Sequence, residues 1–258
     1  MLSPTFEFFE DVCYELHNRD TAILPEDQFL SDERLRDLQD EHQEMNPNAA
    51  VPRALEALQK HFKARGSELP FSYDLSTRSF RVKDKPYIDF VATARNIRGV
   101  GTKSRAFEVA TAHRLIKRGL GSFHRVGWLR LKKKERVPFN AYLRTLGFNS
   151  KVILGKEKDG GFDILWVLPF GSVPHRPIVS FQCKNGSFDL DEAHRSNGAT
   201  QMSLGCHKGL QPAVHTICVV FNDYIDKRML SLKPFTFVPL GLSDLAEPLG
   251  PQATIVIL

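Results

Sequence analysis

Residues 160–189, GGFDILWVLPFGSVPHRPIVSFQCKNGSFD, decide how the fold of this chain is understood. Two runs rich in β-branched and aromatic residues flank a break with several Pro and Gly residues, which predicts two antiparallel strands joined by a turn. Asp163 opens the first run, and the second run ends with Gln-Cys-Lys at 182–184. If the chain turns near Val173, midway between the flanking prolines, Asp163 lies level with residues 182–184 on the neighbouring strand.

Alternation along a strand brings the polar side chains of this hairpin together. Gln182 and Lys184 share one face of their strand, while the side chain of Cys183 points to the other face. A hard cation prefers oxygen ligands, which are available here from the Asp163 carboxylate, the Gln182 amide and the Cys183 carbonyl. A lysine beside such an ion can orient or deprotonate a water, or stabilise a phosphate that gains charge. The pattern therefore predicts a metal site with Lys184 beside it.

Each residue of this set also has a structural interpretation. Asp163 can cap the bend at Gly160-Gly161, and Gln182 can bond to a backbone edge. Lys184 can be a solvated strand end, which is the usual fate of a single lysine. The expected convergence of all three at one level of the hairpin favours the metal site.

The segments on either side of the hairpin predict an α/β fold. Helices are predicted at 3–18, 31–44 and 52–65, so the N-terminal third is mostly helical. The predicted order continues with β character at 71–92, a helix at 104–118, a strand at 122–134, a short helix at 138–148, the hairpin, a helix at 189–204, a strand at 213–222, and a strand with a short helix at 235–249. This order predicts a mixed central β-sheet flanked by helices, with a helical region at 1–70 and a core at 71–258.

The charge of the chain is unevenly distributed. The net charge is only +5, but residues 78–136 hold 17 Lys/Arg and 4 Asp/Glu, whereas residues 1–50 hold 13 Asp/Glu and 3 Lys/Arg. A basic block of this kind is typical of a protein that binds a polyanion. The alternative is a solvated basic face. The charge therefore favours nucleic-acid binding by the segment 78–136.

Composition and cysteine spacing exclude several other classes. The length of 258 residues, with 42% hydrophobic and 25% charged residues, fits a folded soluble protein with a sizeable core. No apolar run approaches the roughly 20 residues of a membrane span, and the acidic N-terminus does not resemble a signal peptide, so we expect a cytoplasmic protein. The cysteines at 13, 183, 206 and 218 have no zinc-site spacing, and we expect them to be reduced.

The hairpin motif resembles that of a known enzyme superfamily. An Asp followed on the adjacent strand by Gln-x-Lys, as in DGGFDI and FQCKN, is similar to the PD-(D/E)xK nucleases. More narrowly, it resembles the Mrr-like branch and certain type II restriction endonucleases, in which Gln replaces the usual acid. The resemblance covers residues 104–222 at the level of element order. One departure is Phe162, which stands where the family usually has Pro.

The resemblance implies a restriction-endonuclease-like core and a set of catalytic residues. Asp163 and Gln182 would bind Mg2+, and Lys184 would serve the attacking water or the phosphate. The Mrr-like pattern also has a Phe-Glu pair on the first core helix, which implies a role for Glu108 after Phe107. A second stretch at 139–148 also resembles that helix and would place Asn140 at the position of the Glu. Glu108 is preferred because it adds charge to a site in which Gln182 is neutral, and we expect weak metal affinity and reliance on substrate phosphate.

The function that the resemblance implies is Mg2+-dependent hydrolysis of double-stranded DNA, by a homodimer that acts as a sequence-specific type II restriction endonuclease. The helical region 1–70 would serve dimerisation or recognition. The alternatives are a structure-selective repair, recombination or transposon-end nuclease, and a DNA-binding defence module without catalysis. Candidate DNA contacts are the cations of two basic stretches, Arg95, Arg98, Lys103 and Arg105 in the first and Arg130, Lys132, Lys133 and Lys134 in the second.

Overall fold

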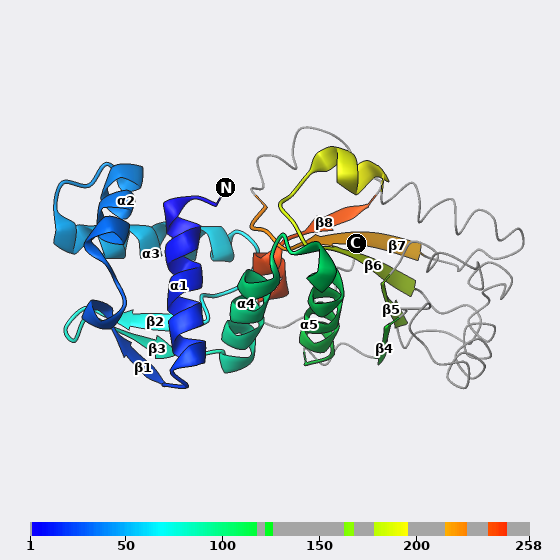
Figure 1. Ribbon diagram of the computed structural model, residues 1–258, viewed down its shortest axis with the longest axis horizontal. Coiled ribbons are helices and arrows are strands. Elements are labelled where there is room, and N and C mark those ends of the chain that lie inside the picture. The colour runs from blue at the N-terminus through cyan, green and yellow to red at the C-terminus, as the bar shows by residue number, and fades with distance from the viewer. Residues whose placement is uncertain are drawn as a thin grey trace, which may run out of the picture. The chain divides into compact units, whose positions relative to one another are not determined.

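The computed structural model describes residues 2–117, 122–125, 163–167, 178–195, 215–225 and 237–246. These residues form two compact units (Figure 1). Unit 1 holds the described residues up to Asn96 together with 242–246, and unit 2 holds those from Ile97 to Gly241. The predicted division at residue 70 therefore falls inside unit 1, because residues 71–96 also belong to it.

The predicted N-terminal helices form the helical part of unit 1. They are α1 (Pro4–Asn18), α2 (Asp32–His42) and α3 (Pro47–Lys63). The Ser31 hydroxyl accepts a hydrogen bond from the Arg34 N–H at 3.2 Å and caps α2. Helix α3 begins five residues before the predicted start because the Asn46 side chain caps it, accepting from the Asn48 N–H at 3.0 Å. Pro52, the predicted start, lies inside the helix.

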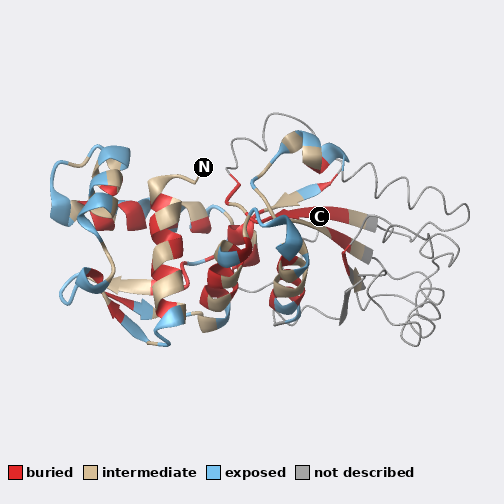
Figure 2. Ribbon diagram, viewed as in Figure 1, coloured by how far each residue is buried: buried red, intermediate tan, exposed pale blue. Residues whose placement is uncertain are grey.

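A small antiparallel sheet completes the first half of unit 1. Its strands are β1 (Ile23–Pro25), β2 (Phe71–Asp74) and β3 (Ser79–Val82), in the order β1-β3-β2. A 3₁₀ turn (Glu26–Gln28) follows β1, and a second one (Leu242–Leu245) returns to unit 1 near the end of the described chain. Buried aromatic side chains join the sheet to α1 and α3, namely Phe8, Phe9, Phe62, Phe71 and Phe80. Figure 2 marks the buried stretches of these helices in red.

The prediction of β structure throughout 71–92 is wrong for its last third, because α4 (Lys85–Ile97) is a helix. Asp84 caps α4, since its carboxylate accepts from the Tyr87 N–H at 3.0 Å and its carbonyl from the Ile88 N–H at 3.0 Å. Pro86 stands in the first turn, where it lacks only an N–H that the helix does not use. Tyr87, Ile88 and Val91 are fully buried, so the apolar residues that suggested a strand form one face of a helix.

Unit 2 is built on a mixed sheet, which confirms the predicted α/β class. After a 3₁₀ turn (Gly101–Lys103) and α5 (Ser104–Lys117), the strands are β4 (Ser122–Arg125), β5 (Ile164–Val167), β6 (Ile178–Lys184), β7 (His215–Phe221) and β8 (Val238–Leu240). Their spatial order is β4-β5-β6-β7-β8, with antiparallel pairing from β4 to β6 and parallel pairing from β6 to β8.

Helices cover this sheet as predicted from the element order. Helix α5 packs against β4 and β6. Residues 190–195 are helical and bury Ala193 against a cluster formed by Ile217, Val219, Phe221, Ile225 and Phe237. The predicted helix at 138–148 and the greater part of the predicted strand at 122–134 lie outside the described residues.

Candidate functional site

The hairpin that carries the predicted site has the expected antiparallel pairing. Ile164 pairs with Phe181 and Val167 with Ile178, so β5 and β6 run side by side with Asp163 directly before β5. The Asp163 N–H donates to the Phe181 carbonyl at 2.8 Å. The Asp163 carboxylate, which is buried, accepts at Oδ2 from the Cys183 N–H at 2.7 Å. The carboxylate therefore lies against residues 181–183 of β6, at the level of Gln182.

The backbone of Cys183 faces the same place. In a β-ladder, a residue directs its N–H and its C=O toward the same neighbouring strand. Because the Cys183 N–H points at Asp163, the Cys183 carbonyl also points to this side of β6, beyond the end of β5. A carboxylate and a backbone carbonyl are thus directed to one edge, which is the donor pair predicted for a hard cation.

Gln182 supplies the most informative atom of the site. Its side-chain oxygen Oε1 is buried and has no hydrogen-bond partner among the residues that the structure describes. A buried polar atom without a partner costs about 1–3 kcal/mol in stability, so it requires an explanation. Bound water or a bound ion is the usual one. The residue type at 182 therefore fits a ligand better than it fits the backbone-edge alternative.

The face of β6 on which Lys184 lies follows from its parallel neighbour. Gln182 pairs with Val219 and Lys184 with Phe221, and directly paired residues share a face of the sheet. This is the face covered by the helical segment 190–195. The Lys184 Nζ lies 2.6 Å from Oε1 of Glu192, and the two side chains are 26% and 35% exposed. Lys184 is therefore held by an ion pair and is not a freely solvated strand end.

Sequence reasoning missed Glu192. The predicted helix start near Asp189 places Glu192 in the first turn of a helix, so its position on the helix could be predicted from the sequence. Its proximity to Lys184, however, depends on the pairing of β6 with β7, which are separated by a long stretch of chain. Only the folded sheet brings the two residues together.

A second missed feature fixes the ends of β6 and β7. Asn222 donates its backbone N–H to the Lys184 carbonyl at 2.9 Å and its side-chain Nδ2 to the Asn185 Oδ1 at 2.9 Å. The Asn185 Nδ2 in turn donates to the carbonyls of Ile97 at 2.5 Å and Val100 at 3.2 Å. This network ties the segment before α5 to the strand that carries Lys184.

Of the two candidates for the acidic position, Glu108 and Asn140, only Glu108 lies among the described residues. Glu108 lies on α5, half-buried, beside the fully buried Phe107. Since α5 packs against β6, Glu108 belongs to the helix that faces the strand of Gln182 and Lys184. Asn140 lies outside the described residues.

Two of the predicted DNA contacts, Arg95 and Arg98, have partners within the fold. Arg95 places Nη2 2.5 Å from Asp11 and its guanidinium 4.7 Å from the centre of the Tyr14 ring, all within unit 1. Arg98 donates from Nε to the Asn222 carbonyl at 2.8 Å and so fastens the start of unit 2 to the end of β7. Both arginines therefore contribute to holding the fold, and their contact with DNA stays a prediction.

Other cations of the basic segment 78–136 are either paired with carboxylates or exposed. Its unit 1 cations pair with carboxylates of that unit, Arg78 with Glu26, Arg81 with Asp74, Lys83 with Glu68 and Lys85 with Asp89. Lys103 and Arg105 of unit 2 are exposed, before and in the first turn of α5. The predicted contacts Arg130, Lys132, Lys133 and Lys134 lie outside the described residues.

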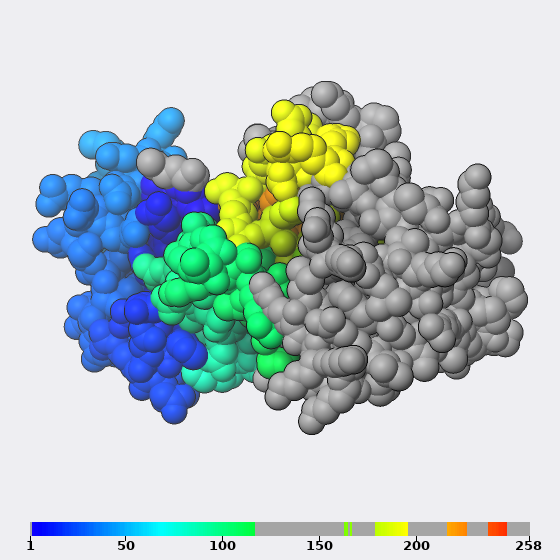
Figure 3. All heavy atoms as spheres, turned by 45° about the vertical axis from the view of Figure 1, so that its right-hand side comes forward, coloured from blue at the N-terminus to red at the C-terminus, as the bar shows by residue number. Residues whose placement is uncertain are grey.

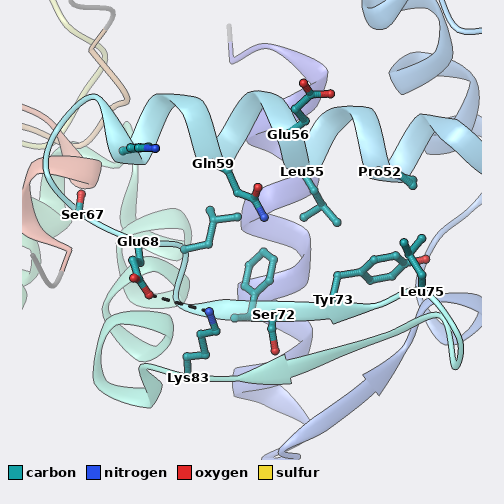
Figure 4. Close-up of a pocket in the computed structure, with 13 residues that line it drawn as sticks. Pro52, Leu55, Glu56, Gln59, Ser67, Glu68, Ser72, Tyr73, Leu75 and Lys83 are labelled. Atoms are coloured by element: carbon teal, nitrogen blue, oxygen red, sulfur yellow. Dashed lines mark ion pairs between the residues drawn. The ribbon is translucent and has the colours of Figure 1, made fainter. Parts of the chain in front are cut away.

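A groove in unit 1 is not part of this site. It has a volume of about 560 Å³ and lies between α3 and β2 (Figure 4). Leu55, Gln59 and Tyr73 line it, and the ion pair of Glu68 with Lys83, at 3.9 Å, also belongs to its wall. None of the predicted site residues lines this groove.

Two further observations bound the chemistry of the described residues. Among them, no three His, Cys, Asp or Glu side chains gather as a metal centre, and the predicted donor set, with one carboxylate, one amide and one carbonyl, is of a different kind. Within the same residues, every helix is too short or too polar to cross a membrane.

Comparison with known proteins gives no family. No family model matches the chain, and no curated protein matches it. The crystal structure of protein VC1899 from Vibrio cholerae aligns with 94% of this chain at 11% sequence identity and a TM-score of 0.31. The alignment covers 48% of that protein, so the chain spans about half of its length. A likeness at this TM-score carries no argument about fold or function.

Proposed function

We propose that this chain is a Mg2+-dependent DNA endonuclease with a restriction-endonuclease-like core in unit 2. The observation that carries the proposal is the buried Gln182 oxygen, which has no partner within the described part of the chain and lies on the strand against which the Asp163 carboxylate packs. A fold keeps such an oxygen at a cost in stability, and a functional site is where that cost is usually found.

The element order supports the proposed core. From 104 to 221, unit 2 runs through α5, β4, β5, β6, the helical segment 190–195 and β7. This is the order of helix, strand, hairpin and helix before a last strand on which the resemblance to PD-(D/E)xK nucleases rests. The motif residues stand at the expected places in it, with Asp163 before β5 and Gln182 and Lys184 near the end of β6.

The donor set fits Mg2+. The ion prefers oxygen ligands, keeps several waters, and is commonly bound through one or two carboxylates together with substrate phosphate. Asp163 would supply the carboxylate, Gln182 the amide oxygen and Cys183 the backbone carbonyl. When bound, Mg2+ would activate a water for attack and neutralise charge on the phosphate. Because Gln182 is neutral, DNA phosphate would contribute much of the remaining charge.

The chain's own groups then have separate tasks. The backbone N–H of Cys183 holds the Asp163 carboxylate in place, and through a bound Mg2+ the side chains of Asp163 and Gln182 would fix the reacting phosphate relative to β6. Lys184 donates hydrogen bonds to the attacking water or to the phosphate oxygen that gains charge. The bond from phosphorus to the 3′ oxygen breaks, leaving 5′-phosphate and 3′-hydroxyl ends.

The substrate of this proposal is double-stranded DNA. The exposed Lys103 and Arg105 beside the start of α5 are the described cations best suited to phosphate contact. A homodimer would cut both strands, and restriction of foreign DNA by a sequence-specific type II enzyme is the proposed role.

The test is cleavage of plasmid, phage and branched DNA in Mg2+, with Lys184→Ala as the inactive variant. Lys85→Ala is the matched control, since Lys85 is also a partly exposed lysine in an ion pair, but in unit 1. We expect discrete fragments from the wild type and the control, and none from Lys184→Ala. Cutting confined to branched DNA would indicate a repair or recombination nuclease. Salt-sensitive DNA binding without cutting of any substrate would exclude the enzyme and indicate a binding module.

A further inference from the structure

We infer that Glu192 is a positioning residue that holds the ammonium group of Lys184 on the Gln182 face of β6. The inference rests on the proposed function, because it assigns to Glu192 a part in the same site. The ion pair of Lys184 Nζ with Glu192 Oε1, at 2.6 Å, is the observation from which it starts.

Glu192 is itself held firmly in place. The Asp189 Oδ1 accepts from the N–H groups of Asp191 at 2.9 Å and Glu192 at 3.1 Å, which caps the helical segment 190–195. The next residue, Ala193, is fully buried in the cluster with Val219 and Phe221. A capped turn on one side of Glu192 and a core residue on the other leave its backbone little freedom.

Phe188, which precedes this helical segment, is also held in place. The Phe188 N–H donates to the Asp223 carboxylate at 2.8 Å, and the Phe188 ring packs against Phe221 with centroids 5.1 Å apart. Phe221 pairs with Lys184 in the β6–β7 register. Glu192 is therefore carried by a segment anchored beside the residue that it binds.

The second oxygen of Glu192 shows that the carboxylate is shared. The Arg195 Nη2 lies 3.0 Å from Oε2, on a side chain that is 73% exposed. The helical segment forms part of the molecular surface (yellow in Figure 3). One oxygen therefore faces a solvated cation while the other faces Lys184, and Arg195 is a natural control for loss of an ion pair to Glu192.

The physical reason for a positioning role lies in the lysine side chain. A lysine carries a point charge on a flexible stem with many rotamers, so without a partner its ammonium samples a wide volume. Exposed ion pairs add little to stability, so the main consequence of this one is geometric. A displacement of about 1 Å in a catalytic group can lower a rate about 100-fold.

The experiment compares Glu192→Gln and Glu192→Asp with Arg195→Ala in DNA cleavage. For Glu192→Gln we expect a kcat about 100-fold lower, an unchanged KM for DNA and an unchanged Mg2+ concentration at half-maximal rate. Glu192→Asp should recover part of the loss, and Arg195→Ala should stay within about twofold of the wild type, since exposed pairs contribute little. An unchanged kcat in Glu192→Gln would overturn the inference. An increased Mg2+ requirement would overturn it too, since Glu192 would then act on the metal.

A second measurement needs no cleavage. Without DNA or Mg2+, chemical acetylation of Lys184, followed by mass spectrometry, should be several-fold faster in Glu192→Gln than in the wild type or Arg195→Ala. Equal labelling rates would overturn the positioning role. If the wild type cuts no DNA, the proposed nuclease fails while labelling still tests the ion pair. If the wild type cuts and Glu192→Gln cuts equally well, only the present inference fails.

Discussion

The two units each bury a polar cluster, and the clusters differ in whether their oxygens are partnered. In unit 1, Glu26 is buried after β1, and both carboxylate oxygens are bound, one by the Tyr73 hydroxyl and the other by the Arg78 guanidinium. Burial, together with the Glu26 carboxylate, raises the pKa of the Tyr73 hydroxyl above its ordinary value near 10. This cluster is closed and joins β1, β2 and β3.

The cluster in unit 2 is open. The Asp163 carboxylate accepts from the Cys183 N–H, and Glu192 binds Lys184, yet the buried oxygen of Gln182 has no partner among the described residues. In a closed cluster, hydrogen bonds and ion pairs offset the free energy lost when its polar groups leave water. In an open cluster, a group without a partner leaves part of that desolvation penalty uncompensated. The comparison teaches that the unit 1 cluster serves the fold and that the unit 2 cluster is suited to a ligand.

The largest effect is expected for Asp163→Asn. The asparagine oxygen still accepts from the Cys183 N–H, but the negative charge that would hold the metal is lost. Cleavage should fall by about 1000-fold or more, while the free energy of unfolding changes by about 1 kcal/mol or less. Cleavage rates and urea unfolding measure the two effects. Full activity in this variant would show that the open cluster is not the active site.

The next largest effect, a loss of stability, is expected at the closed cluster of unit 1. Glu26→Ala leaves the Tyr73 hydroxyl and the Arg78 guanidinium without their partner. Breaking a buried pair costs about 3–5 kcal/mol, and because Arg78 is half exposed we expect about 2 kcal/mol of lost stability in urea unfolding. Cleavage at temperatures where the variant is folded should be unchanged.

The control for this variant is Glu33→Ala, which removes an exposed acid in the first turn of α2. It should change stability by about 0.5 kcal/mol or less. Equal effects of the two variants, or loss of cleavage in Glu26→Ala, would remove the distinction between a cluster that stabilises and a cluster that acts.

A smaller effect of opposite sign is expected at the open cluster. Gln182→Met replaces the amide, whose oxygen has no partner among the described residues, with an apolar group of similar length. Because the buried oxygen gains nothing in the folded state, its removal should raise the free energy of unfolding by about 1 kcal/mol while cleavage is lost. A large loss of stability would contradict this expectation, since it would mean that the oxygen has a partner in solution.

The hairpin could be predicted from sequence because its information is local. Alternation in 178–184 and the Pro- and Gly-rich break fix the register, so the level of Asp163 follows without a structure. Local signals were also sufficient for α4, where Asp84 and Pro86 mark a helix start. The aromatic and β-branched residues of the same stretch favour a strand, and the prediction that rests on them is wrong.

The remaining features depend on contacts between distant segments. Glu192 reaches Lys184 only after β7 has paired with β6, and Asn222 reaches Asn185 for the same reason. Counting charges in 78–136 also does not show which cations are paired within the fold, for example that Arg95 pairs with Asp11 from another part of the chain. Long-range pairing and charge neutralisation are therefore the information that sequence patterns lack.

The smallest effect concerns a buried thiol in each unit. Burial raises the pKa of Cys218, on β7, from its ordinary value near 9 to about 12. Burial also raises the pKa of Cys13, on α1, well above the ordinary value. The folded protein keeps these protons at a pH where the unfolded chain releases them. Each thiol therefore contributes stability that is complete below pH 9 and is lost as the pH rises toward the folded-state pKa.

Between pH 9 and 10 this loss amounts to about 1 kcal/mol for each thiol. Urea unfolding at the two pH values should show a fall that is about 1 kcal/mol smaller in Cys218→Ala, and similarly smaller in Cys13→Ala, than in the wild type. Comparison within one pH range cancels the titration of tyrosines and lysines, which all three proteins share. An unchanged pH dependence in Cys218→Ala would mean that water reaches the face of β7 that Cys218 shares with Phe181, and the burial assigned to that face would then be wrong.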